Sequence, residues 1–330
     1  MSSSSAVLLH QFGVPGEVVE FGEVGLSSPK EGEVLVEIEA APINPADINV
    51  LEGKYGILPV LPAVPGVEGV GVVRSVGGKV QNLQSGDHVL LPHGFGTWRR
   101  WGVLAATDLV VVPPAVPVQQ AAMLRINPAT ALCMLREFVA LQPGDWIVQN
   151  AANSGVGRSV IQIAKACGWR TVNVVRRDTL VPELLSIGAD AVVVDGPELA
   201  QRIKEAMNGE SGSLGLNAVG GESALAIANT LGEDGKLVTY GAMARQPLRV
   251  PNGLLLFKNI SFHGFWVTRW YQRASKEAVA VLFASLFEWA GAGVLCTPIE
   301  AEYTLAQIRD AVIHAQQAQR SGKVLLRPSR

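Results

Sequence analysis

The stretch WIVQNAANSGVG, residues 146–157, decides the fold of this chain. It begins as a short apolar strand and continues into a helix for which Gly168 is a suitable C-terminal cap. Ala152, Ser154 and Gly157 are small residues at the three glycine positions of the fingerprint G-x-G-x-x-G. In that fingerprint they allow the turn, let the backbone approach a pyrophosphate and let the helix lie close to the strand. The stretch predicts a dinucleotide site at a helix N-terminus, and the alternative is an ordinary strand-to-helix turn.

Apolar strands alternate with helical periods around this turn, between residues 121 and 264. Strands that are separated by helices form right-handed crossovers, which give a parallel sheet covered on both faces. The pattern predicts an α/β fold with a doubly wound parallel sheet. The expected strands are residues 146–149, 171–175, 191–194, 214–219, 236–240 and 260–263.

The N-terminal third is β-rich, with short alternating runs between Gly and Pro turns. The stretch after residue 264 holds an apolar helix and a closing segment, which we expect to return to the first domain. We therefore predict a catalytic domain over residues 1–122 and 265–330, and a nucleotide-binding domain over 123–264. The expected strands of the β-rich part are residues 33–39, 69–75 and 88–91.

The composition disfavours several classes of function. The 330 residues carry a net charge of -2 at pH 7, so the chain has no overall basic field for nucleic acid or anionic lipid. We expect neither nucleic acid nor a membrane as a partner, and no transmembrane segment. The first basic residue is Lys30, which differs from the basic start of secretory and mitochondrial leaders, so we expect a cytoplasmic protein. Cys133, Cys167 and Cys296 form no CxxC pair and are expected to be free thiols.

The second strand of the pattern ends in Arg176, Arg177 and Asp178. A site for NAD places an acidic residue at this strand end, where it binds the ribose 2′-hydroxyl. Two guanidinium groups can instead bind the 2′-phosphate of NADPH. We predict NADPH as the cofactor, and the alternative is a pair of solvated surface arginines.

No metal site is expected from the sequence. Zinc needs a cluster of thiolates and imidazoles, whereas the five histidines and three cysteines are scattered. The chain also has no nucleophile elbow of the type G-x-S-x-G. The chemistry is then left to the hydride of the cofactor and to a proton donor of the protein.

Seven short strings, between about Glu31 and Lys323, identify a family. They are INPADIN (43–49), GKYG (53–56), LPAV (61–64), NPATA (127–131), QNAANSGVG (149–157), YGAMA (240–244) and GFW (264–266). With these strings the chain resembles the mitochondrial-type trans-2-enoyl thioester reductases, zinc-free members of the medium-chain dehydrogenase superfamily. Where zinc-dependent relatives carry Gly-His-Glu, this chain has Gly66-Val67-Glu68 and lacks the imidazole.

The resemblance implies a GroES-like catalytic domain beside a Rossmann domain, a homodimer, and a role for single residues. Tyr55 matches the catalytic tyrosine, and Trp266 matches the residue that shapes the site beside the nicotinamide. The chain departs from the family at Arg125, where a small residue is common, and at Leu132, where a tyrosine is common, which leaves the substrate range open. The implied cofactor contacts are Asn127, Asn153, Ser154, Gly155, Val156, Arg176, Arg177, Asp178, Tyr240, Gly241, Ala242, Met243, Phe265, Trp266, Val267 and Lys323.

The implied reaction belongs to fatty acid metabolism. It is the NADPH-dependent reduction of the C=C bond of a trans-2-enoyl thioester on CoA or on acyl carrier protein, with hydride added to Cβ and a proton to Cα. A tyrosine with a pKa of about 10 is protonated at neutral pH and can give this proton. The alternatives are that Tyr55 only packs a loop and that Trp266 is a core aromatic.

Two other functions remain open. An NADPH-dependent quinone or alkenal reductase shares the fold and the fingerprint, and a non-catalytic NADPH-binding protein would reduce no activated alkene. The tract Thr97-Trp98-Arg99-Arg100-Trp101 either presents cations and aromatic faces to CoA phosphates or an acidic carrier, or is a solvated loop anchored by tryptophans.

Overall fold

The computed structural model describes residues 2–318 and 320–330, and the chain divides into two compact units. Unit 1 consists of Met1–Ile126 and Ala284–Arg330, and unit 2 consists of Asn127–Phe283. The segment 265–283, which the sequence assigns to the first domain, is thus part of unit 2. Unit 1 is discontinuous in sequence, and unit 2 is one continuous insertion.

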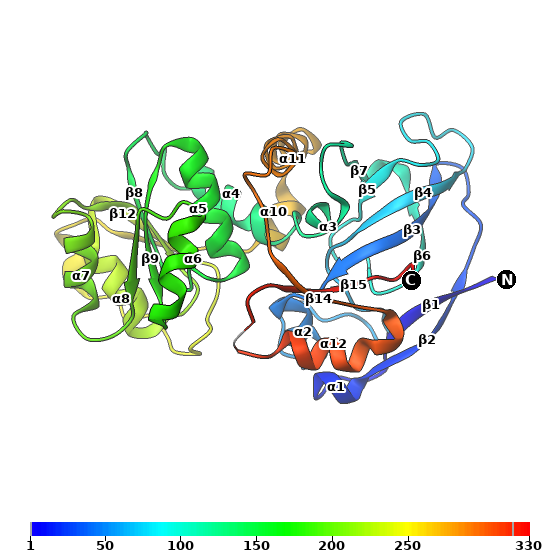
Figure 1. Ribbon diagram of the computed structural model, residues 1–330, viewed down its shortest axis with the longest axis horizontal. Helices are drawn as coiled ribbons and strands as arrows, with labels where there is room; N and C mark the ends of the chain where they lie inside the picture. Colours follow the sequence, from blue (N-terminus) through cyan, green and yellow to red (C-terminus); the bar gives the residue numbers. More distant parts are fainter. Residues whose placement is uncertain (1, 319) are drawn as a thin grey trace. The chain divides into compact units, whose positions relative to one another are not determined.

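Unit 2 is built on a six-stranded parallel sheet with the order β10-β9-β8-β11-β12-β13. The order reverses between β8 and β11, and Figure 1 shows α5 and α6 on one side of the sheet and α7 and α8 on the other. The doubly wound sheet expected from the sequence is confirmed. Its strands are β8 (Trp146–Gln149), β9 (Arg170–Val175), β10 (Ala191–Val194), β11 (Gly212–Asn217), β12 (Leu231–Thr239) and β13 (Ser261–Gly264). Its helices are α4 (Asn127–Glu137), α5 (Gly155–Cys167), η2 (Asp178–Leu180), α6 (Val181–Ser186), α7 (Leu199–Ala206), α8 (Gly221–Thr230), α9 (Asn252–Leu256) and α10 (Val267–Arg273), and α11 (Lys276–Gly291) continues into unit 1.

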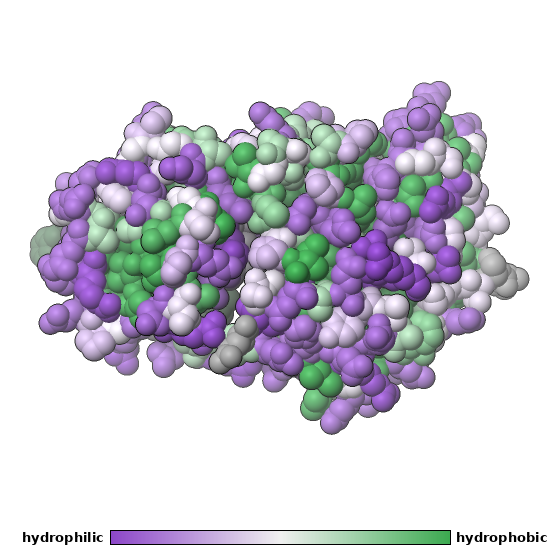
Figure 2. All heavy atoms as spheres, viewed as in Figure 1, coloured by the Kyte–Doolittle hydropathy of each residue, from purple (hydrophilic) through white to green (hydrophobic). Residues whose placement is uncertain are grey.

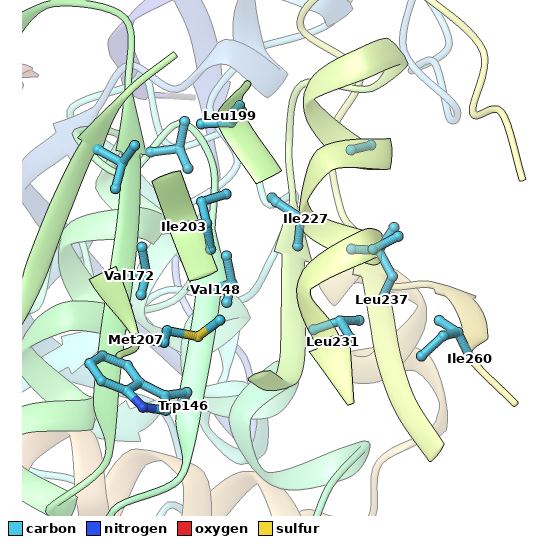
Figure 3. Close-up of a cluster of buried hydrophobic side chains, with 14 of the residues drawn as sticks. Trp146, Val148, Val172, Leu199, Ile203, Met207, Ile227, Leu231, Leu237 and Ile260 are labelled. Atoms are coloured by element: carbon cyan, nitrogen blue, oxygen red, sulfur yellow. The ribbon is translucent and has the colours of Figure 1, made fainter. Parts of the chain in front are cut away.

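The core of unit 2 lies between the sheet and the helices α7 and α8. Figure 3 shows Val148 of β8 and Val172 of β9 beside Ile203 of α7 and Ile227 of α8. All four side chains are fully buried, and each such side chain contributes roughly 1.5–3 kcal/mol relative to exposure. These strands are short apolar runs because both faces of a parallel sheet are covered. The core therefore fixes the carboxyl ends of the strands, where ligands bind in folds of this kind.

Unit 1 is a mainly antiparallel β structure with the order β14-β15-β3-β4-β5-β7, to which β6 adds beside β3 and the hairpin β1-β2 forms a separate sheet. The C-terminal strand β15 pairs antiparallel with β3, with Leu325 opposite Pro42. The expected return of the chain end to the first domain is confirmed. The strands are β1 (Ser2–Leu9), β2 (Val19–Leu26), β3 (Glu33–Pro42), β4 (Val70–Val76), β5 (His88–Leu90), β6 (Trp101–Ala105), β7 (Val110–Val111), β14 (Ile299–Tyr303) and β15 (Lys323–Leu326). The helices are α1 (Pro15–Val18), α2 (Pro45–Leu51), η1 (Ala106–Asp108), α3 (Val118–Ala121), η3 (Leu305–Gln307) and α12 (Ile308–Ala315).

The surface is mostly hydrophilic, as the view in Figure 2 shows, with a greener area over the region of α6 and β9 in unit 2. The partly buried apolar residues packed on the core beneath this region are Leu180, Ile187, Val192 and Val194.

No helix within residues 2–318 and 320–330 has the length and apolar character needed to cross a bilayer.

Candidate nucleotide and active site

The fingerprint turn joins β8 to the first turn of α5. Ser154 is the N-cap of α5, and its hydroxyl oxygen accepts a hydrogen bond from the backbone N of Gly157 at 3.1 Å. The helix ends at Gly168, which has a φ of 74° and lies in the left-handed region that favours glycine. The C-terminal cap agrees with the sequence prediction. The 13-residue helix directs its free N–H groups and its positive dipole end toward the carboxyl edge of the sheet.

Two glycines at the start of α5 pack so closely against their neighbours that a side chain at either position would clash. A Cβ on Gly157 would lie 2.5 Å from the backbone oxygen of Ala152, so the helix packs directly against the turn. A Cβ on Gly155 would lie 2.9 Å from the side chain of Asn127, which begins α4. The neighbours Asn153 and Ser154 are partly exposed, and Val156 is buried. Both glycines therefore allow close packing at the start of α5, which the fingerprint requires of its last glycine.

The segment after β12 forms a second wall beside this turn. Tyr240 N donates to the backbone oxygen of Asn217 at 3.0 Å, and Met243 N donates to that of Ala218 at 2.9 Å. A Cβ on Gly241 would lie 3.0 Å from the Ala218 oxygen, whereas Ala242 and Met243 are exposed. The segment thus runs close against the end of β11.

The hydroxyl of Tyr240 is a buried polar atom that tests the fit of a ligand. Among the described residues it has no hydrogen bond of good geometry. Burial raises its pKa, which the nearby hydroxyl of Ser154 opposes. A buried donor of this kind gains when a ligand supplies an acceptor. The hydroxyl, the two glycines and the helix N-terminus together fit a bound dinucleotide.

A buried network of amides, which the sequence did not point to, organises these loops. Asn150 Nδ2 donates to Asn217 Oδ1 at 2.9 Å and to the hydroxyl of Ser223 at 3.1 Å. The same Asn217 oxygen accepts from the backbone N of Val219 at 3.1 Å and of Gly220 at 3.0 Å. Polar residues at the ends of otherwise apolar strands were the available signal, but their partners lie more than 60 residues away in sequence.

The three polar residues predicted to select the cofactor follow β9. Arg176 and Asp178 are exposed, and Arg177 is partly buried. Within the described ranges neither arginine takes part in an ion pair. Both guanidinium groups are therefore free of competing carboxylates at the strand end where an NADPH 2′-phosphate is expected.

The remaining predicted residues of unit 2 lie around the end of β13. Phe265 is partly buried and its ring meets that of Phe138 edge-on at 6.2 Å. Trp266, also partly buried, is the N-cap of α10, and Val267 is buried at its first position. Leu132, one of the two departures from the family, is fully buried in α4 and has no contact with solvent.

Tyr55 lies in unit 1, in the bend that follows α2. The turn contains Gly53, whose φ of 71° is in the left-handed region, and the Tyr55 side chain is partly exposed between the exposed residues Lys54 and Gly56. The helix is held at its start by Asp47, whose carboxylate accepts from Asn44 N at 2.8 Å and from Val67 N at 3.0 Å. The position of the tyrosine loop therefore depends on a buried carboxylate.

Lys323 belongs to a buried polar cluster of unit 1, together with Asn44, Asp47 and Glu68. Its Nζ donates to Asn44 Oδ1 and lies 3.5 Å from the Ile43 oxygen, and Lys323 is 8% exposed. Asn44 Nδ2 donates to Glu68 Oε1 at 2.8 Å. The family resemblance implied Lys323 as a cofactor contact, and the sequence analysis missed the other three members as a group.

Burial controls the charges of this cluster. It raises the pKa of Asp47 and of Glu68 to about 7 each, and the ammonium of Lys323 opposes both shifts. Burial lowers the pKa of Lys323 to about 8, against the attraction of the two carboxylates. Both oxygens of Glu68 accept hydrogen bonds, so a proton on either one would interrupt a bond, and this geometry favours the ionised form.

Arg125, the second departure from the family, is only 5% exposed. Its positive charge lowers the pKa of Glu68, opposing the effect of burial on that carboxyl. Burial, followed by the charge of Arg125, lowers the pKa of His93 to about 4, so this imidazole is neutral at pH 7. The arginine is thus buried beside a carboxylate and a neutral histidine.

The tract from Thr97 to Trp101 is anchored in the protein. Trp98 is fully buried, and the guanidinium of Arg99 lies 4.9 Å from the centre of the Phe95 ring. Arg100 pairs with Glu37 at 3.1 Å. These contacts favour the anchored loop over a platform of cations for CoA phosphates.

Comparison with known proteins agrees with this geometry. The alcohol dehydrogenase GroES-like domain family matches residues 30–114, and the zinc-binding dehydrogenase family matches residues 155–284. The mitochondrial enoyl-acyl-carrier-protein reductase of Homo sapiens is 40% identical, over 93% of this chain and 84% of that protein. The structure of the Etr1p complex with NADP and crotonyl-CoA has a TM-score of 0.90 at 31% identity, covering 99% of this chain and 100% of that one. A putative NADPH:quinone reductase from Bacillus thuringiensis has a TM-score of 0.91 at 27% identity, covering 99% of each chain.

The names of the curated relatives contradict the expected cytoplasmic location. The relatives from human, frog, rat and Arabidopsis are all named mitochondrial. The expectation rested on the lack of an early basic segment, whereas location is decided by receptors that read an address and not by the fold. The expectation of a cytoplasmic protein is therefore wrong.

Proposed function

This chain belongs to the enoyl thioester reductase family of the medium-chain dehydrogenases, and from that membership we propose how its residues divide the work. The protein is an NADPH-dependent oxidoreductase that reduces the C=C bond of a trans-2-enoyl thioester. The identity of 40% to an enoyl-acyl-carrier-protein reductase over almost the whole chain carries this conclusion. The cradle of Gly155, Gly157 and the Tyr240 hydroxyl supports it, because it fits a dinucleotide.

NADPH supplies a hydride, and the protein must bind it, orient the substrate and deliver a proton. The Cβ atom of an enoyl thioester is electron-poor, so hydride addition there leaves negative charge on the thioester oxygen and a carbon that must be protonated. We assign the proton donor to Tyr55, whose hydroxyl is a weak acid and which lies in a loop fixed by α2 and Asp47. Trp266, at the start of α10, is assigned to the wall beside the nicotinamide.

Cofactor choice is assigned to the end of β9. Arg176 and Arg177 follow this strand with no ion pair among the described residues, and guanidinium groups bind phosphate in a bidentate manner. The contacts expected from the sequence at residues 127, 153–156, 240–243, 265–267 and 323 complete this proposed site. We propose a catalytic role for the domain predicted over 1–122 and 265–330 and a nucleotide-binding role for the one predicted over 123–264, with the segment 265–283 folded as part of unit 2.

The carrier of the acyl group and the assembly of the protein are also proposed. Crotonyl-CoA is bound in the Etr1p structure, and the curated relatives are named for acyl carrier protein, so both carriers are candidates.

We propose a homodimer through unit 2, where β13 is the outer strand of the sheet and Leu256 and Phe257 are 74% and 84% exposed. Sedimentation of the parent and of Phe257→Asp tests this, and a parent that sediments as a monomer would refute it. The names of the relatives support a mitochondrial location.

A substrate panel tests the proposed function. Crotonyl-CoA, crotonyl carrier protein, a quinone and an alkenal are each supplied with NADPH, and the oxidation of NADPH is followed at 340 nm together with the product. We expect a crotonyl thioester to be the substrate with the highest kcat/KM and to be reduced to the saturated butyryl thioester. A higher kcat/KM for the quinone, which the likeness to a quinone reductase makes the natural competitor, would contradict the assignment. Binding of NADPH with no turnover of any of the four would indicate a non-catalytic protein.

A further inference from the structure

The amide of Asn44 lies between a carboxylate and an ammonium. Its Nδ2 donates to Glu68 Oε1 at 2.8 Å, and its Oδ1 accepts from Lys323 Nζ. A carboxylate only accepts and an ammonium only donates, so one orientation of the amide satisfies both neighbours. The three side chains are 2%, 0% and 8% exposed for Asn44, Glu68 and Lys323, which leaves water little access to replace a lost partner.

The second oxygen of Glu68 is also occupied. Glu68 Oε2 accepts from the backbone N of Ile126 at 2.9 Å, and Ile126 is the last residue of unit 1 before the chain continues into unit 2. Glu68 therefore fixes two things at once, the Asn44 amide and the end of the segment that leads to Asn127. The neighbouring Arg125 adds a second positive charge that favours the ionised carboxylate of Glu68.

The ammonium of Lys323 keeps one donor for another partner. It has three N–H donors, and Asn44 Oδ1 and the Ile43 oxygen are the acceptors that the described residues provide. Its backbone is held as well, because Glu300 accepts from Ser321 N at 2.7 Å and from Gly322 N at 3.1 Å immediately before it. A lysine side chain is flexible in solution, and here both its stem and its head are fixed.

Stability does not explain such a cluster. Burying charged groups costs several kcal/mol for each ion, and apolar residues of the same volume commonly stabilise a fold as well or better. A buried set of two carboxylates, an amide and an ammonium is therefore retained for what it positions. The group with a donor to spare is Lys323.

We propose that Glu68 is a positioning residue for cofactor binding: through the Asn44 amide it fixes the ammonium of Lys323, and Lys323 contacts NADPH. This inference rests on the proposed function, which places Lys323 in the cofactor site. Glu68 acts through Lys323, so its effect on NADPH must vanish when the ammonium is absent. A residue that only stabilised unit 1 would show no such dependence.

A double-mutant cycle with NADPH itself as the probe tests this. The parent, Glu68→Gln, Lys323→Met and the double variant are titrated with NADPH, and binding is followed by nicotinamide fluorescence. We expect Glu68→Gln and Lys323→Met each to weaken the affinity for NADPH about 10-fold, because each loses one charge-assisted hydrogen bond. In the Lys323→Met background, Glu68→Gln should have no further effect.

Glu37→Gln is the matched control. Glu37 is another buried carboxylate of unit 1, 7% exposed, and it pairs with Arg74 at 2.7 Å and Arg100 at 3.1 Å. It should lower the melting temperature without changing the affinity for NADPH. An equal loss of NADPH affinity in Glu37→Gln, an unchanged affinity in Glu68→Gln or Lys323→Met, or additive effects in the double variant would overturn the inference.

A further variant covers the case in which Glu68→Gln does not fold. Asn44→Asp keeps an acceptor for Lys323 and loses the donor to Glu68. This variant should also weaken the affinity for NADPH, and an unchanged affinity would overturn the inference. These measurements use no thioester. A parent that binds NADPH and reduces no enoyl thioester would refute the proposed function and leave this test standing.

Discussion

The side chains of Asn150 and Asn217 meet at 2.9 Å at the ends of the neighbouring strands β8 and β11. The side-chain oxygen of Asn217 accepts three hydrogen bonds, and two come from the backbone of the loop that leads into α8. We expect Asn217→Leu, which has a similar volume, to lower the free energy of unfolding by about 3 kcal/mol, because it leaves these buried donors without an acceptor. Urea denaturation measures this. Gln201→Ala, at an exposed position of α7, should change the free energy by less than about 0.5 kcal/mol, and equal effects would contradict the prediction.

Gly157→Ala should abolish the close approach of α5 to the fingerprint turn. The new Cβ would lie 2.5 Å from a backbone oxygen of Ala152, so the helix start must move. We expect a loss of stability of about 1–3 kcal/mol and a weaker affinity for NADPH. Calorimetric titration with NADPH measures the second effect. Gly253→Ala is the control, since its nearest atom would be a Phe257 side-chain carbon at 3.7 Å, and it should bind NADPH as the parent does.

The double variant Arg176→Ala, Arg177→Ala should lose the preference for NADPH. Removing charge-assisted contacts to the 2′-phosphate costs about 1.5–3 kcal/mol, which is about 10- to 150-fold in the ratio of kcat/KM for NADPH and NADH. The measurement is that ratio with crotonyl-CoA. Arg249→Ala, an exposed arginine paired with Glu222 at 3.3 Å, should keep the parental ratio. Equal use of NADH by the parent would show that the two arginines do not recognise the phosphate.

Tyr55→Phe should keep the fold and NADPH binding and lower kcat. It removes one hydroxyl and retains the ring, and the loss of a proton donor lowers the rate by about 10²–10⁴-fold, nearer the lower value if water delivers the proton. Single-turnover kinetics measures the chemical step. Tyr303→Phe is the control, because its hydroxyl bonds to His314 Nδ1 at 2.9 Å and takes no part in the proposed reaction. A parental rate in Tyr55→Phe would refute the role of Tyr55.

His93 should make the fold less stable in mild acid. Burial lowers its pKa from 6.5 to about 4, so below pH 6.5 the unfolded chain binds a proton that the folded protein refuses. The stability that this histidine contributes is therefore present above pH 6.5 and is lost as the pH falls toward 4, with a slope of up to about 1.4 kcal/mol per pH unit.

The effect of His93 is isolated by the difference in the free energy of unfolding between the parent and His93→Asn, followed as a function of pH. The raised pKa values of Asp47 and Glu68 act with the opposite sign in the same range, and they are common to both proteins. The free energy of unfolding, measured in urea from pH 4.5 to 7.5, should fall more steeply toward acid in the parent. Parallel curves would contradict the buried neutral imidazole.

Local patterns were sufficient to predict the parallel sheet of unit 2. The strands 146–149 and 191–194 were predicted with the bounds that β8 and β10 have, because an apolar run between polar turns is typical of a buried parallel strand. Gly168 was predicted as the C-terminal cap of α5 from residue type alone. The strand β12 begins at Leu231, five residues before the predicted start, because Leu231 also pairs with Gly212 of β11. The pairing then shifts register before Lys236, and the intervening Gly232 and Gly235 are residues that a sequence pattern takes as turn residues.

Distant contacts explain what the sequence could not show. Asn44, Glu68 and Lys323 come together from segments up to 279 residues apart, and no periodicity relates them. The tract with Trp98 and Arg99 was ambiguous for the same reason, because only the packing around Trp98 and the ring of Phe95 decides that it is anchored.

The pairing of β15 with β3 has a consequence for biosynthesis. A ribosome that adds about 5–20 residues per second needs roughly 15–60 s between Pro42 and its partner Leu325. Unit 2 ends at Phe283 and can fold while the last residues are still being added, whereas the end of β3 at Ala41 and Pro42 still lacks its partner β15. The nascent chain therefore passes through a stage in which all residues of unit 2 are present while unit 1 still lacks its last two strands.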